Sequence, residues 1–79
     1  MTTVRFTVES AEAGADPKVF FEPEGAEVDL PTGEPITVEI RHPDHGSIEF
    51  AWSSSGLAVW RPSGSVVRAW DKHGKELQL

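Results

Sequence analysis

The residues best suited to metal chemistry stand together in one short segment, His42-Pro43-Asp44-His45. Two imidazoles and a carboxylate can hold zinc or copper when they converge on one point. Convergence is unfavourable here, because His42 ends an alternating apolar segment, His45 lies at a turn tip and Pro43 separates their directions. Asp44 is also an ordinary turn residue. We therefore expect this chain to bind no metal ion and no other cofactor.

Three consecutive serines at positions 53–55 provide hydroxyl groups for nucleophilic chemistry. A catalytic serine needs a base within hydrogen-bonding reach and a third group that orients this base. Asp71 and His73 are of the right types for these two roles, but they belong to another turn. Each turn glycine ends its turn alone rather than opening a helix, so the sequence contains no phosphate-binding loop. These observations predict a protein that is not an enzyme.

Two tryptophans and an arginine, Trp60, Trp70 and Arg68, are the best candidates for binding a small ligand. Exposed indole rings can stack on sugars, and an arginine beside them can mark the mouth of a pocket. The competing interpretation places the indoles in the core, with Arg68 at its rim. The alternation of apolar residues favours the core, so a small-ligand or carbohydrate-binding domain is our second hypothesis.

Negative charge is concentrated in the first half of the chain. The net charge is −6, and residues 1–40 hold nine acids against two bases, whereas residues 41–79 hold four acids against five bases. This charge repels nucleic acids and attracts a basic protein. The acids gather around two predicted turns near a short strand, where they form either a docking surface or protection for a sheet edge. The group consists of Glu22, Glu24, Glu27, Asp29 and Glu34.

Glycines that close short polar turns set the positions of the predicted strands. A glycine accepts the left-handed backbone conformation that ends a three-residue hairpin loop. Six of the seven glycines follow such turns with five to ten residues between them: Gly25, Gly33, Gly46, Gly56, Gly64 and Gly74.

Eight short strands with no helical period predict one all-β domain over residues 1–79. We expect a small antiparallel β-sandwich or flattened barrel built from a hairpin meander, with residues 10–17 as a mobile loop. The expected strands are Thr3–Glu9, Lys18–Glu22, Ala26–Leu30, Pro35–His42, Ser47–Trp52, Leu57–Arg61, Ser65–Asp71 and Lys75–Leu79.

Three-residue loops also predict which residues stand opposite each other, because side chains alternate along a strand. The turn at Gly33 pairs Val28 with Ile36, and the turn at Gly56 pairs Phe50 with Trp60. All the turns agree on one core face. Its predicted members are Val28, Leu30, Ile36, Val38, Ile40, Ile48, Phe50, Trp52, Ala58, Trp60, Val66 and Trp70.

A second apolar set falls on the opposite side of the same predicted strands and must be covered. We expect this set to be covered by a second copy of the protein in a homodimer, by a different partner protein, or by the apolar residues of the first strand. The members proposed for self-association are Leu57, Val59, Leu77 and Leu79, and the competing cover consists of Val4, Phe6 and Val8.

The overall composition narrows the functional class. The chain contains no cysteine, which favours a reducing compartment, and no stretch approaches the roughly 18 apolar residues of a membrane span. Met1–Glu9 has no signal-peptide pattern, so we expect a cytoplasmic protein. The sequence thus predicts a small acidic, non-enzymatic protein-interaction module, whose partner is a basic protein or a second copy, rather than a nucleic acid or a membrane.

Overall fold

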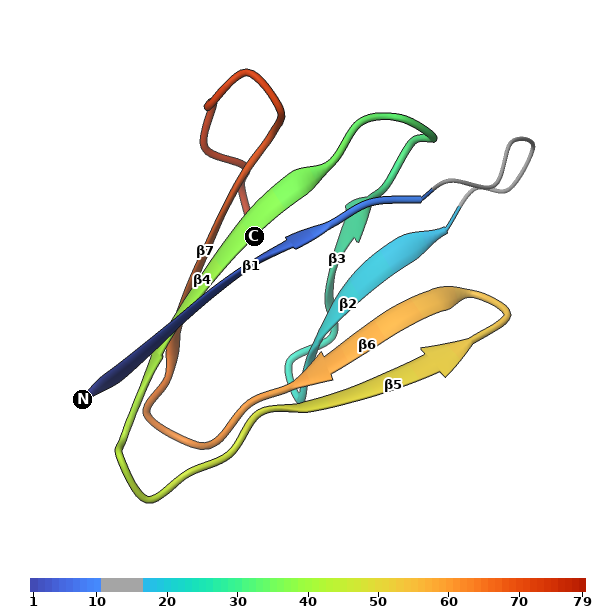
Figure 1. Cartoon of the computed structure of the whole chain (residues 1–79). Coiled ribbons are helices and arrows are strands. Elements are labelled where there is room, and N and C mark those ends of the chain that lie inside the picture. Colours follow the sequence, from blue (N-terminus) through green and yellow to red (C-terminus); the bar gives the residue numbers. More distant parts are fainter. Residues whose placement is uncertain (11–16) are drawn as a thin grey trace.

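A computed structural model describes residues 1–10 and 17–79, which form β-strands and no helix (Figure 1). They build two sheets, one with the order β1-β4-β7 and one with the order β3-β2-β6-β5. The predicted all-β sandwich class is confirmed. No helix in the described ranges is long and apolar enough to cross a bilayer. The strands are β1 (Thr2–Val8), β2 (Lys18–Glu22), β3 (Ala26–Asp29), β4 (Ile36–His42), β5 (Glu49–Ser53), β6 (Gly56–Trp60) and β7 (Val66–Trp70).

The loop predicted over residues 10–17 falls almost entirely on residues 11–16, which lie outside the described residues. Its two flanks are described. The carbonyl oxygen of Ser10 accepts a hydrogen bond from the N–H of Gly33 at 3.2 Å, and that of Pro17 accepts one from Leu30 at 3.0 Å. Both flanks are therefore held beside the segment that joins β3 to β4.

Alternation of apolar residues produces the first sheet. In β4, Ile36, Val38 and Ile40 are buried, while the residues between them are not. The antiparallel pairing of β1 with β4 sets Phe6 opposite Val38 and Val8 opposite Ile36, so their apolar sides face the same way. Buried residues of both sheets then form one core: Val8, Val19, Phe21, Leu30, Ile36, Val38, Ile40, Leu57, Val59 and Ala69.

The connections between strands differ from the predicted meander. The segments after β3, after β4 and after β6 each cross from one sheet to the other, so the turns at Gly33, Gly46 and Gly64 are not hairpins. The predicted pairing of Val28 with Ile36 is therefore wrong. Instead, β4 lies between β1 and β7, and β2 pairs in parallel with β6. These partners are distant in the sequence, and local turn chemistry carries no information about them.

The β5–β6 hairpin forms as predicted, but its register differs by one residue. A two-residue turn, Ser54-Ser55, sets Ser53 opposite Gly56 and Phe50 opposite Val59, where Trp60 was predicted. Because side chains alternate between faces, a slip of one residue exchanges the inner and outer sides of a strand. The outcome is that Val59 enters the core and Trp60 faces solvent.

The tryptophans therefore do not form the core that the sequence predicts. Trp52 is 72% exposed and Trp60 is 45% exposed, while Trp70 is half-buried on the outer side of β7. Phe50 and Val66 are also exposed. The predicted core members that are buried are Leu30, Ile36, Val38 and Ile40, and those that pack against the core are Val28 and Ile48.

The eighth strand predicted over Lys75–Leu79 does not form. A turn follows β7, and a single bridge joins Trp70 to Glu76. The N–H of Leu77 donates a 2.8 Å hydrogen bond to the carbonyl oxygen of Ala69, and the Leu77 side chain packs against the core. This short segment therefore covers part of the outer edge of β7.

Candidate functional site

The outer face of the β3-β2-β6-β5 sheet brings acidic and aromatic candidates together. The parallel pairing of β2 with β6 sets Glu22 beside Trp60, and the pairing of β5 with β6 sets Glu49 on its other side. These side chains point outward, because the neighbouring Phe21 and Val59 point into the core. An exposed indole thus lies in one cross-strand row with two carboxylates.

The next row of this face is apolar. Phe20 lies opposite Ala58, and Ala58 lies opposite Ala51, so a flat strip crosses three strands. Glu27 of β3 stands opposite Phe20 at the end of the strip. An apolar centre with a charged margin is the usual anatomy of a protein-binding surface. We call this surface the acidic face; it consists of Lys18, Phe20, Glu22, Glu27, Asp29, Glu49, Ala51, Ala58 and Trp60.

The carboxylates of the acidic face differ in their partners. The Lys18 Nζ lies 3.6 Å from a carboxylate oxygen of Glu27 and 3.6 Å from one of Asp29. Among the described residues, no salt bridge joins Glu22 or Glu49 to a basic group. The two carboxylates beside Trp60 are therefore the ones available to an external cation.

Glu24, another acid of the predicted cluster, lies in the turn between β2 and β3. Its carboxylate accepts a 2.7 Å charge-assisted bond from the Nη2 of Arg61. The Nη1 of the same arginine donates to the carbonyl oxygen of Ser65 at 2.8 Å. Glu24 is thereby engaged within the chain, and its contribution is to hold the β2–β3 turn against the segment that follows β6.

Edge protection, the competing interpretation of the acids, explains only part of the cluster. β3 is an edge strand, so Glu27 and Asp29 stand where charges discourage pairing with another chain. Glu22 lies on β2, which has neighbours on both sides. Its position beside Trp60 therefore needs another explanation.

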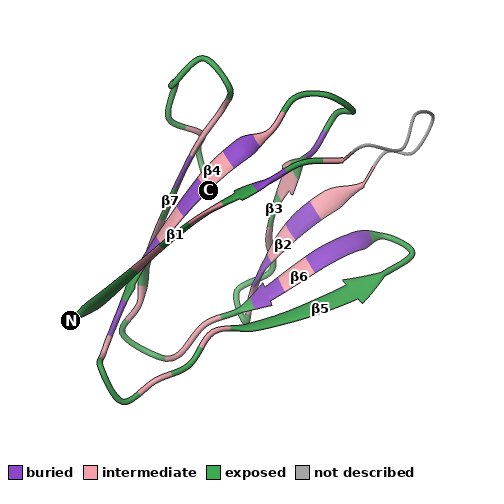
Figure 2. Ribbon diagram, viewed as in Figure 1, coloured by how far each residue is buried: buried purple, intermediate pink, exposed green. Residues whose placement is uncertain are grey.

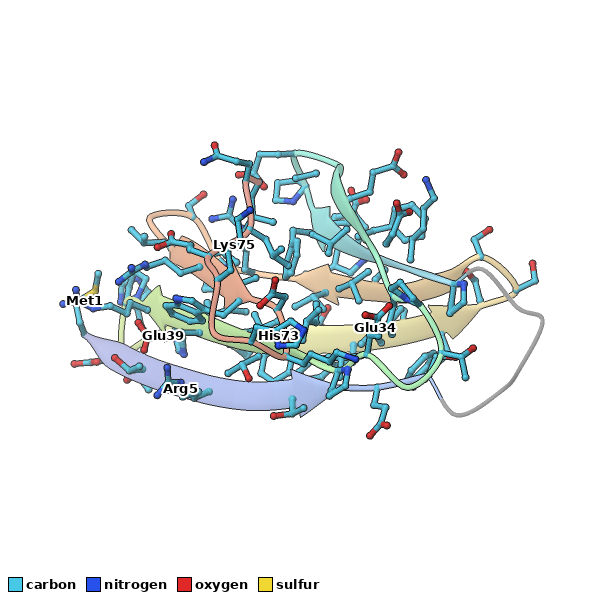
Figure 3. All side chains as sticks on the ribbon, turned by 90° about the horizontal axis from the view of Figure 1, so that it is seen from above. Met1, Arg5, Glu34, Glu39, His73 and Lys75 are labelled. Atoms are coloured by element: carbon cyan, nitrogen blue, oxygen red, sulfur yellow. The ribbon has the colours of Figure 1, made fainter. Side chains whose placement is uncertain are left out.

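Trp70 and Arg68 lie on the opposite outer face, that of the β1-β4-β7 sheet. The guanidinium carbons of Arg5 and Arg68 stand 5.2 Å and 4.9 Å from the Trp70 ring centroid. Arg5 comes from β1, and Glu39 comes from the neighbouring central strand β4 (Figure 3). The strand pairing places Glu39 between Arg5 and Arg68. Because Trp60 belongs to the other sheet, the predicted ligand site formed by Trp60, Arg68 and Trp70 is wrong.

The environment of Trp70 is also unsuited to stacking on a sugar. Two guanidinium groups occupy positions over its ring, where a sugar face would need to lie. Arg68 is held in place by Glu76, with 3.3 Å from Nε to Oε2 and 2.7 Å from Nη2 to Oε1. This pair of hydrogen bonds raises the pKa of Arg68 and lowers the pKa of Glu76. Trp70 thus serves as a platform for the protein's own arginines.

The turn after Trp70 depends on an ionised carboxylate. One oxygen of Asp71 accepts 2.9 Å hydrogen bonds from the backbone N–H groups of Lys75 and His73, which lower the pKa of Asp71 below its ordinary 3.8. A lowered folded-state pKa gives stability that is present above the ordinary value and lost as pH falls through the folded value. We expect the amide NMR signals of these two residues to shift at a pH below 3.8.

Asp71→Asn provides the control for this titration, because asparagine keeps the acceptor oxygen but has no acidic proton. The amide signals of His73 and Lys75 should then stay constant over the same pH range. A midpoint at or above 3.8 in the natural protein, or the same titration in the variant, would contradict the assigned hydrogen bonds.

The apolar set predicted to mediate self-association is largely internal. Leu57 and Val59 are buried in the core, and Leu77 packs against it, whereas Leu79 is exposed. The β5–β6 register is the reason, because it turns the apolar side of β6 inward. A dimer surface made of these four residues is therefore wrong. The competing expectation, burial together with the first strand, matches the packing of Val8 in the same core.

The histidine segment is divided between interior and surface. His42 is buried, and its Nδ1–H donates a 2.7 Å bond to the carbonyl oxygen of Pro43, while His45 is exposed. Asp44 accepts a 2.8 Å bond from the Thr2 hydroxyl, which lowers its pKa. Over residues 1–10 and 17–79, no group of three His, Cys, Asp or Glu side chains is arranged to hold a metal ion.

Glu49, Phe20 and Ala51 are members of the acidic face that were not predicted from the sequence. The alternation in β5 places Glu49 and Ala51 on one side, and a two-residue Ser-Ser turn would have set Glu49 opposite Trp60 and Ala51 opposite Ala58. The parallel β2–β6 pairing that adds Phe20 left no local signal.

Comparison of the chain with protein-family models, with curated proteins and with solved structures finds no match.

Proposed function

We propose that this protein is a non-enzymatic interaction module that binds a basic protein segment on the acidic face. The observation that carries the proposal is the cross-strand row in which Glu22 and Glu49 flank the exposed Trp60. We further propose a cytoplasmic location, which the absence of cysteine favours.

The chemistry of the row suits a lysine or arginine side chain. An indole attracts a cation over its ring, a contribution of roughly 0.5–2 kcal/mol. Carboxylates beside the ring accept charge-assisted hydrogen bonds from the same cation. The flat strip formed by Phe20, Ala58 and Ala51 offers apolar area to the aliphatic part of a long basic side chain.

The other polar groups of the acidic face support binding rather than catalysis. Lys18 has its charge engaged with Glu27 and Asp29, and the nearest hydroxyl is that of Ser53, which borders this face at the end of β5. A nucleophile needs a base within hydrogen-bonding reach. The Ser53 hydroxyl instead lies beside its own turn, where it accepts a hydrogen bond from the Ser55 N–H.

The proposal is tested with an arginine-rich peptide and a glutamate-rich peptide of equal length. Binding is followed by the fluorescence of Trp60 in a protein that carries Trp52→Phe and Trp70→Phe. We expect the basic peptide alone to bind, and its affinity to fall as salt is added. Glu49→Gln should raise the dissociation constant about fivefold, because one unpaired carboxylate is lost. Trp60→Ala should raise the dissociation constant by roughly the same factor, measured by NMR because the fluorescent residue is gone.

Glu39→Gln is the matched control, because it removes the same charge from the opposite outer face. It should leave the dissociation constant nearly unchanged. Equal losses in Glu39→Gln and Glu49→Gln would show that only net charge matters. Such a result, or equal binding of the two peptides, would refute the acidic face as the binding surface.

A further inference from the structure

β5 is an edge strand that is exposed along its whole length (Figure 2). It pairs with β6 on one side, and no described strand pairs with the other. Its sequence, Glu-Phe-Ala-Trp-Ser, contains none of the lysines or prolines that discourage pairing with another chain. Phe50 is 51% exposed and Trp52 is 72% exposed, which is unusual for two large apolar residues on one short strand.

The other sheet edges are better protected. β3 has four residues, and two of them are the acids Glu27 and Asp29. The edge of β7 is partly covered where the Leu77 N–H bonds to Ala69. β1 carries Arg5 at its middle. Of the described edges, β5 thus offers the longest run without a basic side chain, a proline or a covering segment.

The backbone of β5 presents regularly spaced hydrogen-bonding groups at its free edge. In a two-residue hairpin, the pair that closes the turn is hydrogen-bonded, and the following pairs alternate. Ser53 and Gly56 form the pair that closes the turn. The backbone groups of Ala51 and Glu49, at every second position from Ser53, therefore also point toward β6. The N–H and C=O groups of Phe50 and Trp52 therefore point away from the sheet, toward solvent.

We propose that β5 pairs with β5 of a second copy, antiparallel and centred on Ala51, so that a two-fold axis joins the two four-stranded sheets. In this register Phe50 and the partner's Trp52 form a hydrogen-bonded pair, as do Trp52 and the partner's Phe50. All four outward-pointing backbone groups of each copy are then satisfied. Ala51 faces the partner's Ala51 in a non-hydrogen-bonded pair, where small side chains fit well.

The side chains of β5 are self-complementary in this register. Phe50 and Trp52 stand on the inner side, so the two copies form two aromatic cross-strand pairs. Phe6 extends the cluster in each copy, since its ring meets Phe50 edge-on with centroids 5.2 Å apart. On the outer side, Glu49 faces the partner's Ser53, so two carboxylates are not opposed. A shift by two residues would pair only three residues of each strand.

Pairing through β5 does not depend on the binding of a basic segment, because it uses the strand edge rather than the acidic face. The contact involves one five-residue strand and three aromatic rings per copy, which is at the small end of specific interfaces. We therefore expect reversible dimers with a dissociation constant in the micromolar range or weaker. The two acidic faces would become parts of one continuous sheet surface.

Disulfide trapping tests the register directly, because the chain contains no cysteine. In Ala51→Cys the two sulfur-bearing residues would face each other with Cα atoms about 4.5 Å apart, within the range of a disulfide. Ser53→Cys is the matched control: it lies on the same strand and face, but it is roughly 13 Å from its counterpart. Under mild oxidation we expect Ala51→Cys to form covalent dimers at least tenfold faster than Ser53→Cys.

Sedimentation equilibrium provides the second measurement. The natural protein should show concentration-dependent dimers, and Trp52→Lys should weaken them at least tenfold without lowering the thermal stability of the monomer. A protein that stays monomeric up to about 1 mM would overturn the proposal, and the free edge of β5 would then be a site for a different protein. Equal trapping rates for the two cysteine variants would overturn it as well, because they would indicate random encounters.

Discussion

Replacing Gly56 with alanine is expected to lower the free energy of unfolding by about 3 kcal/mol or more. Gly56 has a φ of +139°, a conformation that residues with a Cβ atom rarely adopt. A Cβ atom at this position would also lie 1.9 Å from the carbonyl oxygen of Lys18 and 2.7 Å from its backbone nitrogen. The variant must therefore separate β2 from β6, which pair in parallel at this point.

Gly25→Ala is the matched control, because it shares a positive φ without the clash. Gly25 has a φ of +81°, and a Cβ atom there would meet nothing within 4 Å. It should cost only the backbone term, about 1–2 kcal/mol. Both values come from urea unfolding monitored by circular dichroism. Similar losses in the two variants would mean that the close approach of β2 to β6 is absent.

Replacing Phe21 with alanine is expected to cost about 3–5 kcal/mol, the usual result of removing a fully buried aromatic ring. Phe21 is 1% exposed and is among the largest fully buried side chains of the described core. A domain of this length has a free energy of unfolding of roughly 4–12 kcal/mol. The variant should therefore be largely or partly unfolded at room temperature, with a much lower urea midpoint.

Phe20 precedes Phe21 on β2 and lies on the opposite face of the strand, so its replacement is the control. Phe20 lies on the acidic face opposite Ala58, where its ring is only partly buried. Phe20→Ala should cost about 1 kcal/mol, because little apolar area returns to water. If Phe20→Ala were the more damaging change, the inner and outer faces of β2 would be assigned the wrong way round.

The acidic face could be anticipated only in part. The excess of acids in residues 1–40 and their cluster around the β2–β3 turn are visible in the sequence. That Glu22 neighbours Trp60 depends on a parallel pairing between strands more than thirty residues apart. The separation of Trp60 from Trp70 likewise depends on which sheet each strand joins.

The class of fold and the approximate position of most strands could be predicted from the amino-acid sequence. Alternation with period two is a local property, so the apolar sides of β1 and β4 could be read correctly. The glycine turns likewise mark where strands end, as at Gly25, which adopts a φ of +81° between β2 and β3. These features need no knowledge of distant parts of the chain.

Which strands become neighbours, and which side of β6 faces inward, depends on contacts between distant parts of the chain. A glycine turn permits a hairpin as readily as a crossing between sheets, and the choice depends on contacts such as those of β4 with β1 and β7. The turn between Ser53 and Gly56 has two residues instead of three. Because neighbouring side chains of a strand point to opposite faces, that single residue moved Trp60 from the predicted core to the surface.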